Sequence, residues 1–248
     1  MLGASNQRVQ RLRRLLGRRS ARRDDGAFVV EGEVVLAEAL AAGWEVEEVY
    51  VAAGHDLALE LPPGIRVQEL APGVVERVAS TDSPQPVLAV VAQRHPVLSE
   101  LTSPTFVVVC VGVADPGNAG TIVRSAEAAG ADAVVLTPGS VDVYNPKVVR
   151  ASAGALFHLP VVSEVGLEAV RQLGLTTLGT SSHRGSAHTA TDLTRPIALV
   201  LGNEAHGLAG GSAIDEWVTI THAGRAESLN VAMAATVLCF EVARQRGA

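Results

Sequence analysis

The chain has 248 residues, 48% of them hydrophobic, and a formal net charge of −6 at pH 7. This length and apolar content are enough for one large domain or two ordinary ones, each with a packed core. The longest apolar run, residues 106–114, is far shorter than the ~20 residues that span a bilayer, and the first residues hold no apolar signal core. We therefore expect no membrane segment.

The two cysteines argue against both a disulfide framework and a metal site. Cys110 and Cys239 lie inside apolar runs and lack the spacing of metal ligands, so we interpret them as small core residues. The histidines show no metal-ligand spacing either, and no metal is expected. Free core cysteines are typical of a reducing compartment, which predicts a cytoplasmic location.

Positive charge is concentrated at the start of the chain, although the whole chain is acidic. Residues 1–23 contain eight arginines and no acidic residue. Clustered guanidinium groups suit phosphates, so this segment predicts a nucleic-acid partner. A solvated basic helix face and a disordered basic tail remain the alternatives.

The first hundred residues read as a small α/β domain. Two breaker segments, residues 62–64 and 83–86, separate short apolar runs. Residues 93–104, with two prolines and no sustained periodicity, are the best linker, and we divide the chain into domains 1–97 and 98–248. The expected strands are 28–30, 46–51, 65–70 and 87–91, and the expected helix is 33–42, closed by Gly43.

The second half repeats a strand, loop and helix, which implies parallel strands joined by crossover helices. Asn145, followed by proline, is the expected N-cap of one helix. The expected strands are 106–113, 133–136, 176–180, 197–201 and 217–220, and the expected helices are 118–129, 146–156 and 229–246.

The expected terminal helix is apolar nearly all round between Leu229 and Phe240. One buried face cannot explain that pattern, so the helix needs contacts on two sides. A subunit interface and deep burial in the core account for it equally well.

Three segments rich in glycine and polar residues follow predicted strands, at the edge where open parallel sheets bind ligands. The first lacks the Gly-x-Gly-x-x-Gly pattern of dinucleotide binding. Each is ambiguous alone, because Asn118 or Ser228 could cap a helix and Glu204 could be a turn carboxylate. Together, in this order and each beside a predicted strand, the three segments are a strong signal of a functional site. The segments are 115–124 (Asp-Pro-Gly-Asn-Ala-Gly-Thr-Ile-Val-Arg), 201–208 (Leu-Gly-Asn-Glu-Ala-His-Gly-Leu) and 220–231 (Ile-Thr-His-Ala-Gly-Arg-Ala-Glu-Ser-Leu-Asn-Val).

These segments resemble the signature motifs of the SpoU (TrmH-like) RNA 2′-O-ribose methyltransferases, and the resemblance covers the whole C-terminal domain. Residues 144–154 are also similar to the family between its first and second motifs, and residues 28–32 resemble the substrate-binding module of ribosomal-RNA members. The resemblance implies S-adenosylmethionine as methyl donor, a homodimer, and a trefoil-knotted parallel-sheet α/β methyltransferase domain behind a smaller N-terminal α/β RNA-binding domain. Topology rules alone would have argued against a knot.

Positions that match the family's motifs supply the expected site residues. The implied donor-binding set, which acts largely through backbone groups, is Thr180, Gly202, Ile220 and Leu229. The implied catalytic set is Asn118, Arg124, Glu204, Ser228 and Asn230. Family proposals cast the arginine as a base, but a guanidinium is effectively never neutral in proteins. Clamping a phosphate and orienting the 2′-oxygen are physically easier roles for Arg124, and the choice between a base and a positioning group stays open.

The third motif departs from the family pattern, in which the strand commonly continues Ile-Pro-Met. Here the residues are Ile220, Thr221 and His222. Loss of proline removes a fixed φ angle and loosens the loop. His222 invites a catalytic interpretation, but we leave it out of the catalytic set.

Three functions compete at this point. The separate front domain favours 23S ribosomal RNA as substrate, whereas small transfer-RNA members resemble a catalytic domain with modest extensions. Transfer RNA therefore remains the rival substrate. A non-catalytic RNA-binding or ribosome-assembly protein is the rival from another class, and the intact Arg124, Glu204 and Asn230 weigh against it.

Overall fold

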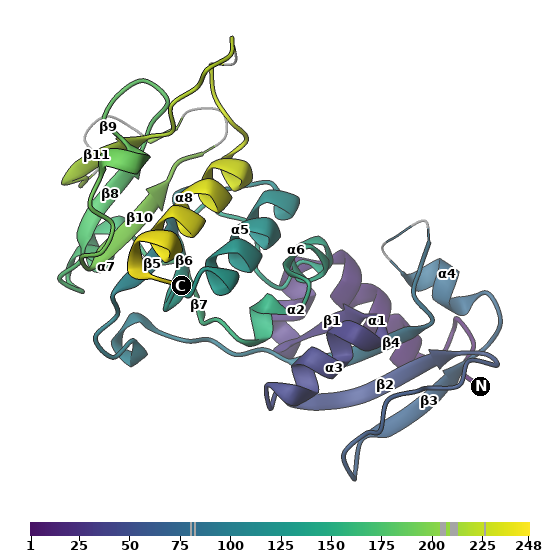
Figure 1. Cartoon of the computed structure of the whole chain (residues 1–248). Coiled ribbons are helices and arrows are strands. Elements are labelled where there is room, and N and C mark those ends of the chain that lie inside the picture. The colour runs from purple at the N-terminus through teal and green to yellow at the C-terminus, as the bar shows by residue number, and fades with distance from the viewer. Residues whose placement is uncertain (80, 82, 204–206, 209–212, 226) are drawn as a thin grey trace. The chain divides into compact units, whose positions relative to one another are not determined.

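The computed structural model describes residues 1–79, 81, 83–203, 207–208, 213–225 and 227–248. The chain divides into two compact units, Met1–Arg94 with Tyr144–Phe157, and His95–Val143 with His158–Ala248 (Figure 1). The sequence-based division assigns Tyr144–Phe157 to the C-terminal domain. In the structure, this segment packs with the N-terminal residues.

The first unit is built on a four-stranded mixed sheet with the order β1-β4-β2-β3. β4 is antiparallel to both β1 and β2, and β2 is parallel to β3. Its strands are β1 (Ala27–Glu31), β2 (Val46–Ala52), β3 (Arg66–Leu70) and β4 (Val87–Ala92), and its helices are α1 (Gln7–Gly17), α2 (Arg19–Asp25), α3 (Glu33–Ala41), α4 (Val74–Val78) and α6 (Pro146–Ser152).

The arginine-rich start of the chain is helical, which the sequence interpretation left open. Asn6 caps α1 by accepting a hydrogen bond from the Arg8 backbone N–H at 2.9 Å. Val9, Leu12 and Leu15 follow at helical spacing and are fully buried on one face of the sheet, where α4 also packs. The apolar face therefore holds the helix to the core, and its arginines lie on the other sides.

An aromatic cluster joins α6 and the turn that follows it to the first sheet. The ring of Phe28 lies 4.6 Å from that of Tyr144, and the ring of Trp44 lies 5.2 Å from that of Phe157, centroid to centroid. The Trp44 indole N–H also donates to the Phe157 carbonyl oxygen at 3.0 Å. Aromatic contacts of this kind stabilise beyond the area they bury, so residues 144–157 are part of this core.

The second unit contains a seven-stranded sheet with the order β7-β6-β5-β10-β8-β11-β9, in which every pairing is parallel. This confirms the expected parallel α/β domain. β5 and β10, at the centre, are buried along their whole length. The strands are β5 (Phe106–Cys110), β6 (Ala133–Leu136), β7 (Val161–Ser163), β8 (Thr176–Thr180), β9 (Ser186–Ala187), β10 (Ile197–Leu201) and β11 (Glu216–Thr219).

Helices cover this sheet. Val170 of α7 (Leu167–Arg171) packs on the sheet face that also carries Val107 and Val200. α5 (Pro116–Ala128) and α8 (Val231–Arg246) lie side by side (Figure 1), and the hydroxyls of Ser125 and Thr236 share a 2.7 Å hydrogen bond between them. No helix in the described part of the chain is long and apolar enough to cross a membrane.

Several expected boundaries were wrong for local reasons. The strand expected over 106–113 ends at Cys110, and Gly112 then takes a φ of 64°. The helix expected over 146–156 ends at Ser152, because Ala153 and Gly154 both have positive φ angles of 50° and 96°. The Asn145 cap of that helix is confirmed, since its side chain accepts from the Lys147 backbone N–H at 2.9 Å.

The terminal helix begins at Val231 rather than Leu229, and its cap is Asn230 rather than Ser228. Cys110 and Cys239 are free and buried, as expected of core residues. Burial raises the pKa of the Cys239 thiol to about 12, so this thiol stays protonated. The cytoplasmic location stays a prediction.

Candidate active site

A cavity of about 640 Å³ opens at the C-terminal ends of β8, β10 and β11 and reaches the start of α8. β8 lies between β10 and β11 in the sheet. Because parallel strands all end at one edge, the loops that follow them meet there. This is the edge that the three motif segments were expected to share.

All four residues of the expected donor-binding set line this cavity. Thr180 ends β8 and Gly202 follows β10 directly. Ile220 follows β11, and Leu229 lies two residues before α8. Ser228 and Asn230 of the expected catalytic set line the same cavity. The structure therefore brings six of the expected residues to one place.

The described residues that follow β10 are joined to one another and to Gly112 by close contacts. The Gly207 N–H donates to the Asn203 carbonyl at 2.8 Å, and the Asn203 side chain donates to the Gly112 carbonyl at 2.8 Å. Gly202 packs so closely against Gly207 that a Cβ at position 202 would lie 2.3 Å from the Gly207 carbonyl carbon. Only glycine fits this approach. Glu204, of the expected catalytic set, lies outside the described residues.

Asn118 does not line the cavity but is joined to it through Asn230. The Asn230 amide donates to the Asn118 side-chain oxygen at 3.0 Å, while its own oxygen accepts from the Ala232 N–H at 2.9 Å as the cap of α8. Asp115 caps α5 and accepts from the Asn118 backbone N–H at 2.8 Å. The two helix N-termini are thus adjacent, and both asparagine side chains are held in place.

Arg124 lies apart from the cavity. It is exposed on α5 and forms no hydrogen bond or ion pair with another described residue. Its guanidinium is therefore available to a ligand that approaches from outside. The structure groups Asn118 and Asn230, leaves Arg124 on the neighbouring surface, and does not describe Glu204.

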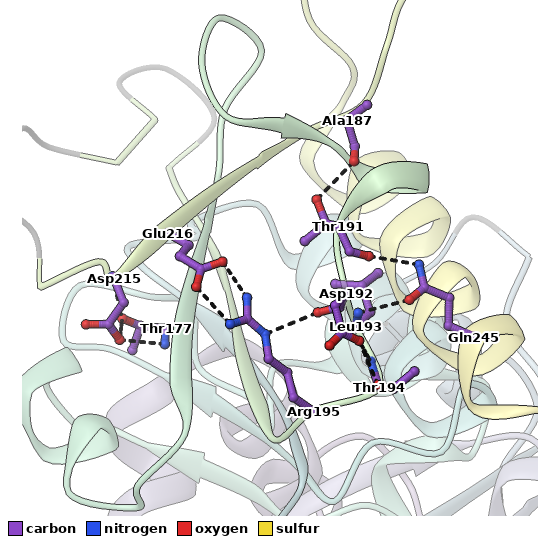
Figure 2. Close-up of polar contacts among 10 residues, drawn as sticks. All are labelled: Thr177, Ala187, Thr191, Asp192, Leu193, Thr194, Arg195, Asp215, Glu216 and Gln245. Atoms are coloured by element: carbon purple, nitrogen blue, oxygen red, sulfur yellow. Dashed lines mark hydrogen bonds and ion pairs between the residues drawn. The ribbon is translucent and has the colours of Figure 1, made fainter.

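At the N-terminal ends of β8, β10 and β11, polar contacts join the first residues of the strands to the loops that precede them (Figure 2). Asp215 accepts hydrogen bonds from the Thr177 hydroxyl at 2.7 Å and its backbone N–H at 2.9 Å, which keep the pKa of that carboxyl below its usual value. Arg195 binds Glu216 through both carboxylate oxygens and lowers the pKa of Glu216 likewise. These contacts tie β8, β10 and β11 together at the ends of the strands that lie away from the cavity.

Arg184 and Trp217 are among the residues of the cavity wall that sequence reasoning missed. The Arg184 guanidinium lies 3.3 Å above the ring centroid of Trp217, and both residues line the cavity. The ring packs over Gly179, where a Cβ would lie 3.0 Å from it. Trp217 is the only tryptophan after residue 44, and this was the one signal that could have marked it.

The eight N-terminal arginines differ in their contacts, and Arg23, which is exposed, pairs with the neighbouring Asp24 at 3.3 Å. Arg11 pairs with Asp25 and Glu47 at 2.7 Å each, Arg8 lies 3.4 Å from Glu48, and the buried Arg22 donates to the Leu15 carbonyl at 2.7 Å. These three stabilise the fold. We define the exposed arginine group as Arg13, Arg14, Arg18 and Arg19, whose side chains face solvent on α1, on α2 and at their junction.

Comparison with known proteins matches the two parts of the chain separately. The model of the SpoU rRNA Methylase family matches residues 105–240, and that of the MRM3-like substrate binding domain matches residues 6–89. Among the described residues, no group of histidine, cysteine, aspartate and glutamate is placed to hold a metal ion. The fold and cavity therefore define a parallel α/β enzyme domain with an attached substrate-binding domain.

Relatives match nearly the whole chain. The 23S rRNA (guanosine(2553)-2′-O)-methyltransferase RlmP of Bacillus subtilis is 33% identical over 244 residues, 96% of this chain and 97% of its own. The 23S rRNA (uridine(2479)-2′-O)-methyltransferase of Streptomyces viridochromogenes is 35% identical over 264 residues, 97% of this chain and 91% of its own. The crystal structure of the SpoU methyltransferase AviRb from Streptomyces viridochromogenes, in complex with the cofactor AdoMet, has a TM-score of 0.86 and 34% identity, covering 97% of this chain and 98% of that one. The chain belongs to the SpoU rRNA methylase family.

Proposed function

We propose that this protein is an S-adenosylmethionine-dependent RNA 2′-O-ribose methyltransferase whose substrate is 23S ribosomal RNA. The observation that carries this proposal is the meeting of the second and third motif segments in one cavity, with the first motif hydrogen-bonded to its rim. The substrate is supported by relatives of nearly full length that are named for 2′-O methylation of 23S rRNA. The match to a substrate-binding domain over residues 6–89 supports it as well.

The cavity residues fit this donor. Leu201, Ile220 and Leu229 offer apolar surface to an adenine ring, and the hydroxyls of Thr180 and Ser228 offer hydrogen-bond partners for polar groups of a nucleoside. The volume of about 640 Å³ is within the usual range for small-molecule sites. When bound, the donor supplies an electrophilic methyl group.

The chain's own residues have to align a poor nucleophile. A ribose 2′-hydroxyl reacts only when its oxygen points at the methyl group and its proton has a destination. The fixed Asn118–Asn230 pair can orient the nucleotide by hydrogen bonds. Because a guanidinium is a poor proton acceptor, the role of Arg124 is to hold a phosphate and the 2′-oxygen in place.

The homodimer is the second part of this proposal. Met233, Val237 and Phe240 are 63%, 38% and 49% exposed and recur at helical spacing along α8. A row of large apolar side chains facing water on a helix is typical of a protein interface. A second copy of the chain bound to this row would cover it, which also explains the nearly all-round apolar pattern of the helix. Phe240→Glu is expected to convert a dimer into a monomer in light scattering.

A dimer also gives a reason why Arg124 lies away from the cavity of its own chain. Arg124 of one subunit would complete the site at the cavity of the other. Mixing Arg124→Ala chains with Gly202→Ala chains tests this directly. If the two residues act across the interface, half of the dimers are mixed and each has one intact site, so about one quarter of wild-type activity returns. If they act within one chain, the mixture remains inactive.

The function is tested by transfer of radiolabelled methyl from S-adenosylmethionine to unmodified ribosomal RNA and to transfer RNA, with wild type and Arg124→Ala. We expect label on ribosomal RNA that disappears in the variant. Label on transfer RNA alone would favour the rival substrate. Donor binding without transfer to either RNA, or to ribosomal particles, would favour a non-catalytic RNA-binding or ribosome-assembly role.

A further inference from the structure

The chain between β8 and β9, residues 181–185, is a short turn that is tied to β11 at both ends. The Ser181 backbone N–H donates to the Val218 carbonyl oxygen at 3.0 Å. Gly185 lies so close to β11 that a Cβ there would lie 2.4 Å from the carbonyl carbon and oxygen of Trp217. Only glycine fits this approach, and the two residues that follow it pair with β11 as β9. The turn is therefore held at a fixed place beside the strand.

Arg184 lies in this turn, and stacking holds its side chain in place. The guanidinium lies 3.3 Å from the ring centroid of Trp217, a residue of β11. The ring in turn packs against Gly179 of β8. A guanidinium that stacks on an aromatic ring keeps its N–H donors, because they lie in its plane and point outward from its edge. The contact therefore positions the positive charge without neutralising it.

No described carboxylate neutralises Arg184. The residue is exposed and forms no hydrogen bond or ion pair with another described residue. Among the described residues that line the cavity, it is the only arginine or lysine. Glu227 is the only carboxylate among those same residues, and it forms no ion pair with Arg184. The rim of the cavity thus carries a positioned cation whose missing partner is an anionic group of a ligand.

RNA brings anionic groups to this rim. A ribose whose 2′-oxygen meets the methyl group is joined to one phosphate on its 3′ side and to another on its 5′ side, so two negative charges pass the cavity. Under the proposed function, Arg124 holds one phosphate from outside the cavity. A second contact needs a second cation, and the planar donors of a guanidinium match the oxygens of a phosphate. Phosphate contacts of this kind fix the register of a nucleic-acid strand.

We propose that Arg184 is an RNA-binding residue that holds a backbone phosphate beside the ribose to be methylated. Trp217 is a positioning residue that acts through Arg184, since its ring keeps the guanidinium at the rim. The inference rests on the proposed function, because it places RNA at the same cavity. It gives Arg184 a role in binding RNA and none in binding the methyl donor.

The first test compares Arg184→Gln with wild type in methyl transfer to an unmodified 23S ribosomal RNA transcript. We expect the KM for RNA to rise about 5-fold, as for an exposed ion pair, while kcat changes less than about twofold. The slope of log K for RNA binding against log salt concentration should become shallower by about 0.7–0.9, the value of one phosphate contact. An unchanged KM and an unchanged slope would overturn the proposal.

Arg171→Gln is the matched control. It removes the same charge from the same unit, but Arg171 pairs with Asp215 at the end of β11 that lies away from the cavity. The KM for RNA and the salt slope should therefore stay at their wild-type values. An equal effect of Arg171→Gln and Arg184→Gln would show that only the overall charge matters, and would overturn the proposed contact.

Calorimetry with two donor analogues separates RNA binding from donor binding. S-adenosylhomocysteine carries an amino-acid carboxylate, and 5′-methylthioadenosine lacks it. Both should bind Arg184→Gln with wild-type dissociation constants. Weaker binding of S-adenosylhomocysteine alone would show that Arg184 pairs with the carboxylate of the donor, and the assignment to RNA would be wrong.

The phosphate is tested in RNA fragments in which one phosphate next to the methylated nucleotide, once mapped, is a neutral methylphosphonate. One of the two positions should weaken binding to wild type about 5-fold and binding to Arg184→Gln much less, because the same contact cannot be lost twice. Equal losses in the two chains at both positions would refute the contact.

Trp217→Leu tests the positioning role. It should raise the KM for RNA in the wild-type chain and have little further effect in the Arg184→Gln chain. Equal effects in both chains would show that Trp217 acts only by packing against Gly179. If Trp217→Leu unfolds, Trp217→Phe, which keeps a ring, replaces it in the same comparison. If the wild-type chain methylates no RNA, the proposed function fails; if it does and Arg184→Gln behaves as wild type, only this inference fails.

Discussion

Gly202→Ala is the substitution for which the structure gives the clearest magnitude. The added Cβ would lie 2.3 Å from the Gly207 carbonyl carbon, 2.6 Å from its oxygen and 2.6 Å from the Leu208 nitrogen. All three are backbone atoms, so no side-chain rotation relieves the clash. Ordinary van der Waals contact of a Cβ begins near 3.4 Å. The backbone of Gly207 and Leu208 therefore has to move by about 1 Å. Such overpacking typically costs about 1–3 kcal/mol of stability.

The same displacement moves the cavity wall. A shift of about 1 Å in a positioned group can lower a reaction rate about 100-fold. We therefore expect donor affinity and the rate of methyl transfer each to fall at least 10-fold. Calorimetry with S-adenosylhomocysteine and thermal unfolding measure the two effects. Gly224→Ala is the control, since a Cβ at that third-motif glycine meets no atom within 4 Å. A Gly202→Ala chain with wild-type stability and donor affinity would refute the reasoning.

Three further expectations concern charged side chains. Arg124→Ala should keep the donor dissociation constant within about twofold, because Arg124 does not line the cavity, while methyl transfer falls by about 100-fold or more; a parallel loss of donor affinity would contradict this. Changing the exposed arginine group to glutamine should make the slope of log K for RNA binding against log salt concentration shallower by about 0.7–0.9 for each phosphate that the protein no longer neutralises. Arg11→Gln removes two ion pairs of the fold and should instead lower the melting temperature. Hydrogen bonds from Arg244, the larger cause, and from Gln245 lower the pKa of Glu241 from 4.5 to about 2. The stability from this group is therefore present above pH 4.5 and lost as the pH falls toward 2; thermal unfolding of Glu241→Gln across that window should show a flatter acid dependence, and an unchanged slope would count against it.

The sequence predicted the parts of the fold that depend on local pattern. The strands 133–136, 176–180 and 197–201 have the bounds expected of them. The first and third are apolar runs between residues that favour turns, whereas 176–180 holds three threonines, which favour strands. The meeting of Thr180, Gly202 and Ile220 was also expected, because parallel strands bring their C-terminal ends to one edge. β7 and α7 were missed, since elements of three and five residues are too short to show a period.

Other features depend on contacts between residues far apart in the chain, which no local pattern contains. The eight N-terminal arginines look alike in sequence, yet Arg11 pairs with Asp25 and Glu47 and therefore does not belong to the exposed arginine group. The partner of Asn118 is Asn230, which lies 112 residues away. Similarly, nothing in the third motif indicates that the Nε2 atom of His222 is buried.

The place of residues 144–157 in the first unit determines when that unit can be completed during synthesis. A ribosome that has made only the first 97 residues has released Phe28 and Trp44 but not Tyr144 and Phe157, whose rings contact them. The nascent first unit therefore keeps an open aromatic surface until residues 95–143 of the second unit have also emerged. During that period the surface is exposed to chaperones and to aggregation. A gene fragment cut at the linker would keep that surface open permanently.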